Sequence, residues 1–348
     1  MIANDPLRAA VQSYCALISR DRLLVQAAGG NVSWKTIDTL WIKASGTWLA
    51  DAEAREVFVP VDRQQIDNAL ANADYAFSPK SREGYTLRPS IETLLHALMP
   101  HQFVLHLHPV DALVHLAGLT CRADLDVLLG DVFEWELIDY HKPGAELAQA
   151  VHAKLREKPD VQVVLLKNHG VIIGAETIQE IDQHLITLSK CLRKQPRQLV
   201  TDTTETFEIL IHETMEGIPY QFSSDARFHC LATDPELYLR LGNSWAICPD
   251  HVVFLGAQAV CIDRLSKLRI ALETFELPPP FIFVRGIGVL ESLAITEAQK
   301  AQLLFYVDVM ERVPTGQRLN SLGIAEISSL LGWEAEKYRM TLKRSCLT

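Results

Sequence analysis

The chain of 348 residues lacks long hydrophobic runs, paired cysteines and long basic runs. No apolar run approaches the roughly 20 residues that a membrane-spanning helix needs. The first 22 residues are polar and interrupted by charges, unlike a signal peptide. We therefore expect a cytoplasmic protein with no membrane partner.

The scarcity of other residue types excludes further classes of protein. The seven cysteines are scattered and form no CxxC pair, which argues against a disulfide framework or a thiolate metal site. Lys and Arg number 33 against 43 Asp and Glu, so the net charge of −10 disfavours general nucleic-acid binding. The 17 glycines and 16 prolines are too few for a fibrous or low-complexity chain. An ordinary globular protein remains.

The length exceeds that of a usual single hydrophobic core and predicts two domains. A polar segment at 193–205 is the candidate linker, and we place the domains at 1–200 and 206–348. Apolar periodicity predicts an α/β organisation in both. Helices are expected at 6–28, 90–99, 110–116, 145–155, 177–194, 294–313 and 324–343, and strands at 31–35, 39–43, 57–61, 103–108, 161–166, 171–174, 251–255, 259–262 and 281–284.

Three histidines form the strongest local signal. His106 and His108 lie two residues apart on a predicted strand, so both point to the same face. His169 follows another buried strand, where loop residues commonly project into a cleft. Three imidazoles with an open fourth position are typical of catalytic zinc. The alternative is that His106 and His108 are hydrogen-bonded core residues and that His169 is a turn residue before Gly170.

Glu92 stands at the start of the helix that leads into the histidine strand. Its simplest role is to stabilise the helix dipole. Beside a metal, the same carboxylate could move a proton to or from a bound substrate.

Two loops rich in small residues, Gly29–Ser33 and Ala44–Thr47, are candidate clamps for a phosphate or carboxylate, because their N–H groups can approach an anion closely. Turn chemistry alone would also explain each loop. Lys43 and Arg88 are basic candidates nearby, with a solvated surface position as the equal alternative.

Five motifs, GGNVS, ASG, the acid in PSIE, HLHP and KNHG, occur in this order and resemble the class II aldolase/adducin family over about residues 5–195. The resemblance implies a three-layer α/β/α domain with a mainly antiparallel central sheet, here followed by a smaller C-terminal α/β extension that ends in helices. It also implies a homo-oligomer, with a tetramer favoured and active sites at subunit boundaries. Within the family, residues 87–109 are most similar to the aldolase portion of rhamnulose-phosphate aldolase/dehydrogenase fusion proteins. However, Arg285–Leu290 lacks the third glycine of a dinucleotide-binding fingerprint.

The resemblance also implies roles for individual residues. The three histidines match the metal ligands, Zn²⁺ or another divalent ion being the expected cofactor, and Glu92 matches the catalytic acid/base. Ile91 departs from the pattern, because many relatives have a second serine there, and this predicts weaker phosphate binding or a substrate without phosphate. The positions that match substrate-phosphate contacts are Asn31, Ser45, Gly46 and Ser90.

We therefore predict that residues 1–200 form a zinc-dependent aldolase that cleaves a ketose or sugar-phosphate-like hydroxy-carbonyl substrate through a metal-stabilised enediolate. An epimerase, dehydratase or decarboxylase with the same metal site is the alternative, and a non-catalytic adducin-like assembly module is a weaker one. The second proton donor is open, with Tyr140, Tyr220 and Tyr306 as candidates. The extension at 206–348 has no assigned role.

Overall fold

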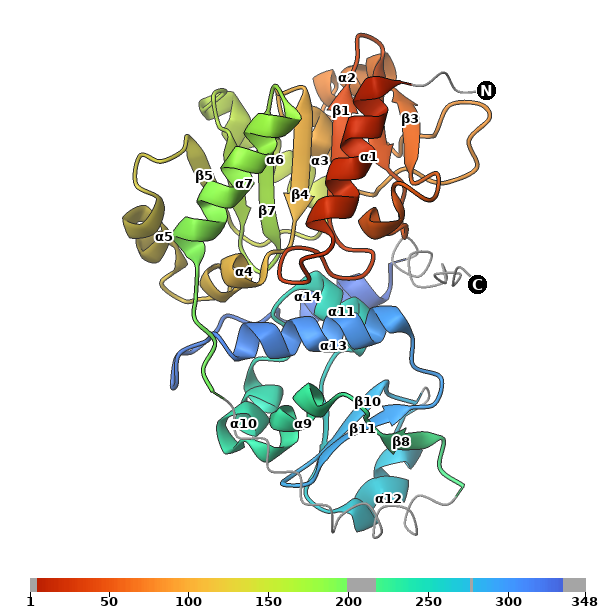
Figure 1. Cartoon of the computed structure of the whole chain (residues 1–348), viewed down its shortest axis with the longest axis vertical. Coiled ribbons are helices and arrows are strands. Elements are labelled where there is room, and N and C mark those ends of the chain that lie inside the picture. Colours follow the sequence, from red (N-terminus) through yellow and green to blue (C-terminus); the bar gives the residue numbers. More distant parts are fainter. Residues whose placement is uncertain (1–4, 199–216, 276–277, 334–348) are drawn as a thin grey trace. The chain divides into compact units, whose positions relative to one another are not determined.

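The computed structural model describes residues 5–198, 217–275 and 278–333 (Figure 1). The chain divides into two compact units, the first comprising Met1–Arg193 and Trp333–Thr348 and the second Lys194–Gly332. The predicted assignment of a catalytic domain to 1–200 and of an extension to 206–348 stays a prediction, because contacts alone do not show what each part does.

The first unit is built on a seven-stranded sheet with the order β3-β2-β1-β4-β7-β6-β5. Every neighbouring pair is antiparallel except β5 and β6. The expected mainly antiparallel sheet is therefore confirmed. Its strands are β1 (Asn31–Lys35), β2 (Thr39–Lys43), β3 (Phe58–Asp62), β4 (Phe103–Leu107), β5 (Trp135–Ile138), β6 (Val163–Leu166) and β7 (Gly170–Ala175).

Helices cover both faces of this sheet, as Figure 1 shows for α1 and α7 in front and α6 behind. Side chains of α1 and α7 belong to one buried cluster, and those of α3 and α6 to another. These are the three expected layers. The helices are α1 (Pro6–Ile18), α2 (Arg63–Ala71), α3 (Thr93–Leu98), α4 (Val110–Leu116), α5 (Cys121–Leu129), α6 (Ala145–Glu157) and α7 (Ile178–Leu192), with a short 3₁₀ helix at Leu49–Asp51.

Strand β4 shows how the layers arise from the sequence. Leu105 packs in the cluster that contains residues of α1 and α7, whereas Val104 packs in the cluster that contains residues of α3 and α6. Successive side chains of a strand point to opposite faces, so an uninterrupted apolar run can bury both. His106 shares the face of Val104 and therefore points towards the layer of α3 and α6.

The second unit has a four-stranded sheet with the order β8-β11-β10-β9. Its helices include the two that were expected near the end of the chain, although part of the second prediction, 324–343, lies outside the described residues. The elements are β8 (Tyr220–Phe222), α9 (Ala226–Thr233), α10 (Pro235–Asn243), α11 (Pro249–Leu255), β9 (Val260–Ile262), a 3₁₀ helix (Leu265–Lys267), α12 (Leu268–Glu273), β10 (Phe281–Val284), β11 (Gly288–Ser292), α13 (Glu297–Met310) and α14 (Ile324–Leu331).

Two sequence predictions of secondary structure are wrong. Residues 251–255 belong to helix α11 rather than to a strand, because Pro249 occupies its first turn and the apolar side chains are buried on all sides of it. A short apolar run does not distinguish these two possibilities. The first helix ends at Ile18 instead of about Ala28. Directly after Ile18, the Ser19 hydroxyl donates to the Cys15 carbonyl, and turns follow.

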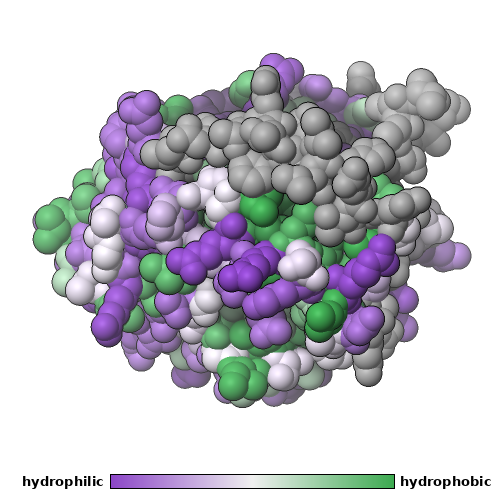
Figure 2. Space-filling model, turned by 90° about the horizontal axis from the view of Figure 1, so that it is seen from below, coloured by the Kyte–Doolittle hydropathy of each residue, from purple (hydrophilic) through white to green (hydrophobic). Residues whose placement is uncertain are grey.

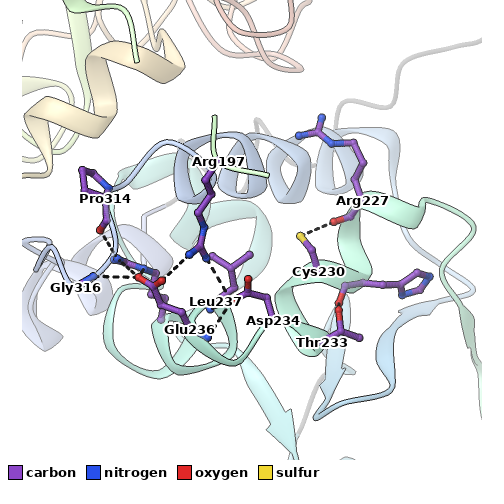
Figure 3. Close-up of polar contacts among 11 residues, drawn as sticks. Arg197, Arg227, Cys230, Thr233, Asp234, Glu236, Leu237, Pro314 and Gly316 are labelled. Atoms are coloured by element: carbon purple, nitrogen blue, oxygen red, sulfur yellow. Dashed lines mark hydrogen bonds and ion pairs between the residues drawn. The ribbon is translucent and has the colours of Figure 1, made fainter. Parts of the chain in front are cut away.

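The described part of the predicted linker is attached to the second unit through Arg197 (Figure 3). Its N–H donates to the Glu311 carbonyl at 2.8 Å, and its guanidinium lies 2.6 Å from Glu236. Arg240 also donates to Glu236, at 2.7 Å. Burial raises the pKa of Glu236, but hydrogen bonds, led by the one from Arg240, outweigh it and hold this pKa at about 2. The remainder of the predicted linker, from 199, lies outside the described residues.

The described surface and helices are ordinary in composition. Figure 2 shows hydrophobic and hydrophilic residues intermixed on the face that it draws. None of the described helices combines the length and hydrophobicity that crossing a bilayer requires. All six cysteines within the described residues are thiols, and Cys346 lies outside them.

Candidate metal centre

Strand pairing brings the three predicted histidines together at one edge of the sheet. Strands β4 and β7 are antiparallel, with Leu107 opposite Val171, so the end of β4 lies beside the start of β7. His108 directly follows β4, and His169 directly precedes β7. Asn168 has a φ of +53°, a left-handed conformation that Asn tolerates better than most residues, and it completes the tight turn from β6.

The imidazole rings converge as the spacing predicts. The ring centroids lie 4.9 Å (His106 to His108), 4.9 Å (His106 to His169) and 5.0 Å (His108 to His169) apart. One nitrogen of each ring lies within 4.8 Å of the others, and all three residues are buried. The Nε2 atoms of His106 and His108 are 3.1 Å apart. Tetrahedral zinc with bonds of about 2.0–2.1 Å requires ligand nitrogens roughly 3.3 Å apart, so the His106–His108 pair has nearly the required spacing.

A backbone carbonyl fixes the orientation of the His106 ring. Its Nδ1 lies 2.9 Å from the Val171 carbonyl oxygen, which can only accept a hydrogen bond. Nδ1 therefore carries a proton, which leaves Nε2, facing the cluster, as the nitrogen that can bind a metal ion. Metal-ligating histidines typically have such a partner on the other ring nitrogen.

Glu92, the residue directly before α3, adds a carboxylate to the histidine cluster. The predicted helix start at 90 is three residues early, and Glu92 is the N-cap residue of α3, although its side chain accepts no hydrogen bond from the helix. Its Oε1 instead lies 3.5 Å from His106 Nε2 and 3.4 Å from His169 Nε2. Asn31 Nδ2 donates to the other oxygen, Oε2, at 2.7 Å. The helix-dipole role does not explain this orientation.

The residues fit a divalent metal ion. Among the described residues, the buried Glu92 Oε1 accepts no hydrogen bond, although a buried carboxylate oxygen without a partner is costly. A cation between it and the imidazoles would supply the missing interaction. Imidazole nitrogen and carboxylate oxygen are donors that zinc accepts.

The predicted anion-binding residues separate into two groups. Asn31 lies with Glu92, opposite His106 in the β1–β4 pair. Ser45 and Ser90 are buried and line one cavity together. Gly46 follows Ser45 with a φ of +76°, a conformation that glycine adopts without strain.

For Lys43 the sequence left open whether the side chain lies near the site or on the solvated surface. The structure shows that the surface position is wrong. Only 1% of Lys43 is exposed, and Nζ donates to the carbonyls of Ala28 (3.1 Å) and Thr47 (2.7 Å). Ala28 directly precedes the first small-residue loop and Thr47 is the last residue of the second, so the ammonium group connects both. Lys43 follows the continuous apolar run Leu40–Ile42, which is typical of a strand buried on both faces, and this run is the signal that could have indicated burial.

His96 is a second residue that the sequence did not single out. Its Nδ1 lies 2.8 Å from the Ser33 hydroxyl, and its ring centroid is 6.5 Å from that of His106. Burial lowers the pKa of His96 well below its usual range, with smaller contributions from His106 and nearby lysines. It therefore packs as a neutral residue behind the cluster.

Two of the three candidate second proton donors belong to the second unit. Tyr220 and Tyr306 are buried in the second unit, where their hydroxyls donate to the carbonyls of Pro279 (2.6 Å) and Ser244 (3.1 Å). Burial raises the pKa of Tyr220 to about 12. The identity of a second donor stays a prediction.

The fold and the cluster define the first unit as a three-layer α/β/α domain with a candidate metal centre at one edge of its sheet. The chain belongs to the class II aldolase and adducin family, since the model of the class II aldolase and adducin N-terminal domain matches residues 9–195, more than half of it. Class II aldolases typically depend on a divalent metal, and members of the family bind sugar phosphates and often form oligomers.

Individual relatives are more distant. A protein of Bacillus subtilis (strain 168) named "Uncharacterized oxidoreductase YuxG" is 26% identical over 410 residues, which span 94% of this chain but only 57% of that protein. Among solved structures, the N-terminal class II aldolase domain of a conserved protein from Thermoplasma acidophilum is 25% identical (TM-score 0.44, 55% of this chain and 94% of that one). The L-fuculose-1-phosphate aldolase of Thermus thermophilus is 19% identical (TM-score 0.37, 63% and 100%). None of these tests the expected similarity to dehydrogenase fusions.

Proposed function

We propose that this protein is a zinc-dependent aldolase that cleaves a carbon–carbon bond of a ketose or sugar-phosphate-like hydroxy-carbonyl compound. The observation that supports the proposal most strongly is the orphaned Glu92 Oε1 at 3.4–3.5 Å from two imidazole nitrogens in a buried three-histidine cluster. When bound, a divalent cation supplies the positive charge that polarises a substrate carbonyl. The family assignment supports the same chemistry.

The surrounding residues have distinct roles in this proposal. Glu92 moves the proton to or from the reacting carbon. Asn31 holds Oε2, which leaves Oε1 turned towards the cluster. The loop residues Ser45, Gly46 and Ser90 hold the distal anionic group and thereby orient the substrate. Lys43 holds the two loops together through its hydrogen bonds to the carbonyls of Ala28 and Thr47.

Two other activities are less well supported. The name of the Bacillus subtilis relative suggests a redox reaction, and Gly286–Gly288 is the glycine pair that could bind a dinucleotide. In the structure this segment joins the antiparallel strands β10 and β11, whereas dinucleotide binding uses a turn between a strand and a helix. An adducin-like assembly module would have no need for the intact cluster.

The assembly and location of the protein follow the family expectation. We propose a homo-oligomer, with a tetramer favoured, that works in the cytoplasm on small sugars or sugar phosphates and not on nucleic acid. Light scattering on the purified protein measures the number of subunits.

The decisive experiment incubates the zinc-loaded protein with a panel of ketoses, ketose phosphates and sugar acids and measures aldehyde release. We expect release with at least one substrate and loss of both zinc and activity in His169→Ala. His141→Ala is the matched control, because His141 is half-buried and makes no hydrogen bond or ion pair among the described residues. An isomerised, dehydrated or decarboxylated product without aldehyde would instead support the epimerase, dehydratase or decarboxylase alternative. Stable wild-type protein that binds no metal would contradict every enzymatic version.

A further inference from the structure

A cavity of about 800 Å³ opens in the first unit beside Ser45 and Ser90. The three histidines and Glu92 do not line it, so it extends the site beyond the serine pair. Its size is that of a pocket for a whole small molecule, typically about 300–1,000 Å³, and far exceeds the space that one phosphate group fills.

Most of the wall comes from residues 72–92, a long connection between α2 and α3 without helix or strand. Connections of this length are usually functional or disordered. This one is anchored, since Ser81 forms a bridge to β3 and Pro89 a bridge to the residue after β2. Phe77 and Leu87 line the cavity and also pack against the buried cluster of β2 and β3. The wall is therefore preformed.

The described charged residues around the cavity are of one sign. Lys80 and Arg88 line it, whereas none of the described Asp or Glu residues does, in a chain whose net charge is −10. Lys80 forms no hydrogen bond or ion pair within the part of the chain that the structure describes. A concave surface with cations only attracts anions. Ser45 and Ser90 provide hydroxyl donors at the same cavity. Ile91 contributes an apolar side chain to the wall instead of a further hydrogen-bond donor.

We propose that this cavity is a second substrate subsite, and that the substrate is an elongated hydroxy-carbonyl compound with two anionic groups. One group lies at Ser45 and Ser90, and the other, at the end of a tail, lies near Lys80 and Arg88. The inference rests on the proposed function for the reaction and names the class of substrate. A compact sugar monophosphate would leave most of the cavity unfilled.

Isothermal titration calorimetry with methylphosphonate and with alkane bisphosphonates of increasing chain length tests the subsite. We expect one chain length to bind about tenfold more tightly than methylphosphonate, because a second charge-assisted contact is added. Lys80→Ala and Arg88→Ala should each reduce this ratio about three- to fivefold. Arg82→Ala is the matched control, because Arg82 lies on the same segment, pairs with Asp38 and does not line the cavity. Equal zinc loading in all preparations makes the direct affinity of each phosphonate for the metal the same in every variant, so that it cancels from the comparison of variants.

Three results would overturn the subsite: equal affinity for mono- and bisphosphonates at every length, no binding of either, or a ratio that the two cavity variants change no more than Arg82→Ala does. Aldehyde release is measured on the same preparations. Aldol cleavage without a length preference would contradict the subsite and leave the aldolase in place. A length preference that depends on Lys80 and Arg88, without aldehyde from any substrate, would contradict the aldolase and leave the subsite in place.

Discussion

Asn31 and Glu92 are 61 positions apart in the sequence, and the side-chain amide of the first donates to the carboxylate of the second at 2.7 Å. The bond holds Oε2, while Oε1 faces His106 and His169. Asn31 matches a substrate-phosphate contact in the family resemblance, but the structure places it on the proposed general base. Kinetics can separate these two roles.

Replacement of Glu92 by Gln should remove the proton acceptor without disturbing its surroundings, because Asn31 can still donate to the amide oxygen. We expect kcat to fall by about 10²- to 10⁴-fold, with zinc content and melting temperature close to those of the wild type. Glu146→Gln, at an exposed position of α6, is the control and should retain full activity. Wild-type turnover in Glu92→Gln would remove this residue from the mechanism.

Asn31→Ala distinguishes positioning of the base from binding of the substrate. If Asn31 orients Glu92, kcat falls about tenfold or more while KM changes little, because an interaction needed in the transition state is lost. A rise in KM at constant kcat would show instead that Asn31 contributes uniform substrate binding. Asn68→Ala, at an exposed position of α2, is the control. Steady-state kinetics on the substrate found by the panel provides both constants.

Gly170 fixes the approach of β7 to β4 beside the histidines. A Cβ at this position would lie 2.3 Å from the Leu107 carbonyl oxygen and 2.7 Å from His108 Cδ2. The backbone of β4 would have to move to make room for this Cβ. We therefore expect Gly170→Ala to lower the free energy of unfolding by about 3 kcal/mol and to weaken zinc binding. Urea unfolding and metal analysis measure the two effects.

The matched control for Gly170 is Gly242 in α10, where nothing lies within 4 Å of an added Cβ. Gly242→Ala should raise the free energy of unfolding by about 0.5–1 kcal/mol, because alanine favours a helix over glycine. Unchanged stability and zinc content in Gly170→Ala would show that the two strands can separate without cost.

The sequence predicted those features that depend on local pattern. The bounds 31–35 and 39–43 are those of β1 and β2, because alternation and flanking turn residues are local. The convergence of His106 and His108 follows from a spacing of two residues on one strand. His169 could be added because it follows another buried strand.

The features that the sequence missed depend on register between distant segments. Nothing local pairs Asn31 with His106 or turns Glu92 away from its helix. Lys43 was open between burial and solvent because a lysine is buried only where carbonyls surround its ammonium group, and these come from the separate loops at Ala28 and Thr47. The error at 251–255 arose because burial on all sides removes the periodicity that distinguishes a helix from a strand.

His229 in the second unit is held in its neutral form by two backbone groups. The Val289 N–H donates to Nδ1 at 3.1 Å, so this nitrogen carries no proton. Nε2 lies 3.0 Å from the Ser223 carbonyl oxygen and therefore donates. A second proton on the ring would break the bond from Val289.

Acid should therefore destabilise the protein in part through His229. Burial lowers the pKa of His229 below its usual 6.5, although the bond to Ser223 and the charges of Asp225 and Glu291 oppose the shift. Below pH 6.5 the unfolded chain takes up the proton first, so the free energy of unfolding falls as the pH drops towards the folded-state pKa. His229→Gln can keep both hydrogen bonds without titrating, and should show a shallower decline in urea unfolding between about pH 7 and pH 5. An unchanged slope in His229→Gln would assign the acid sensitivity to other groups.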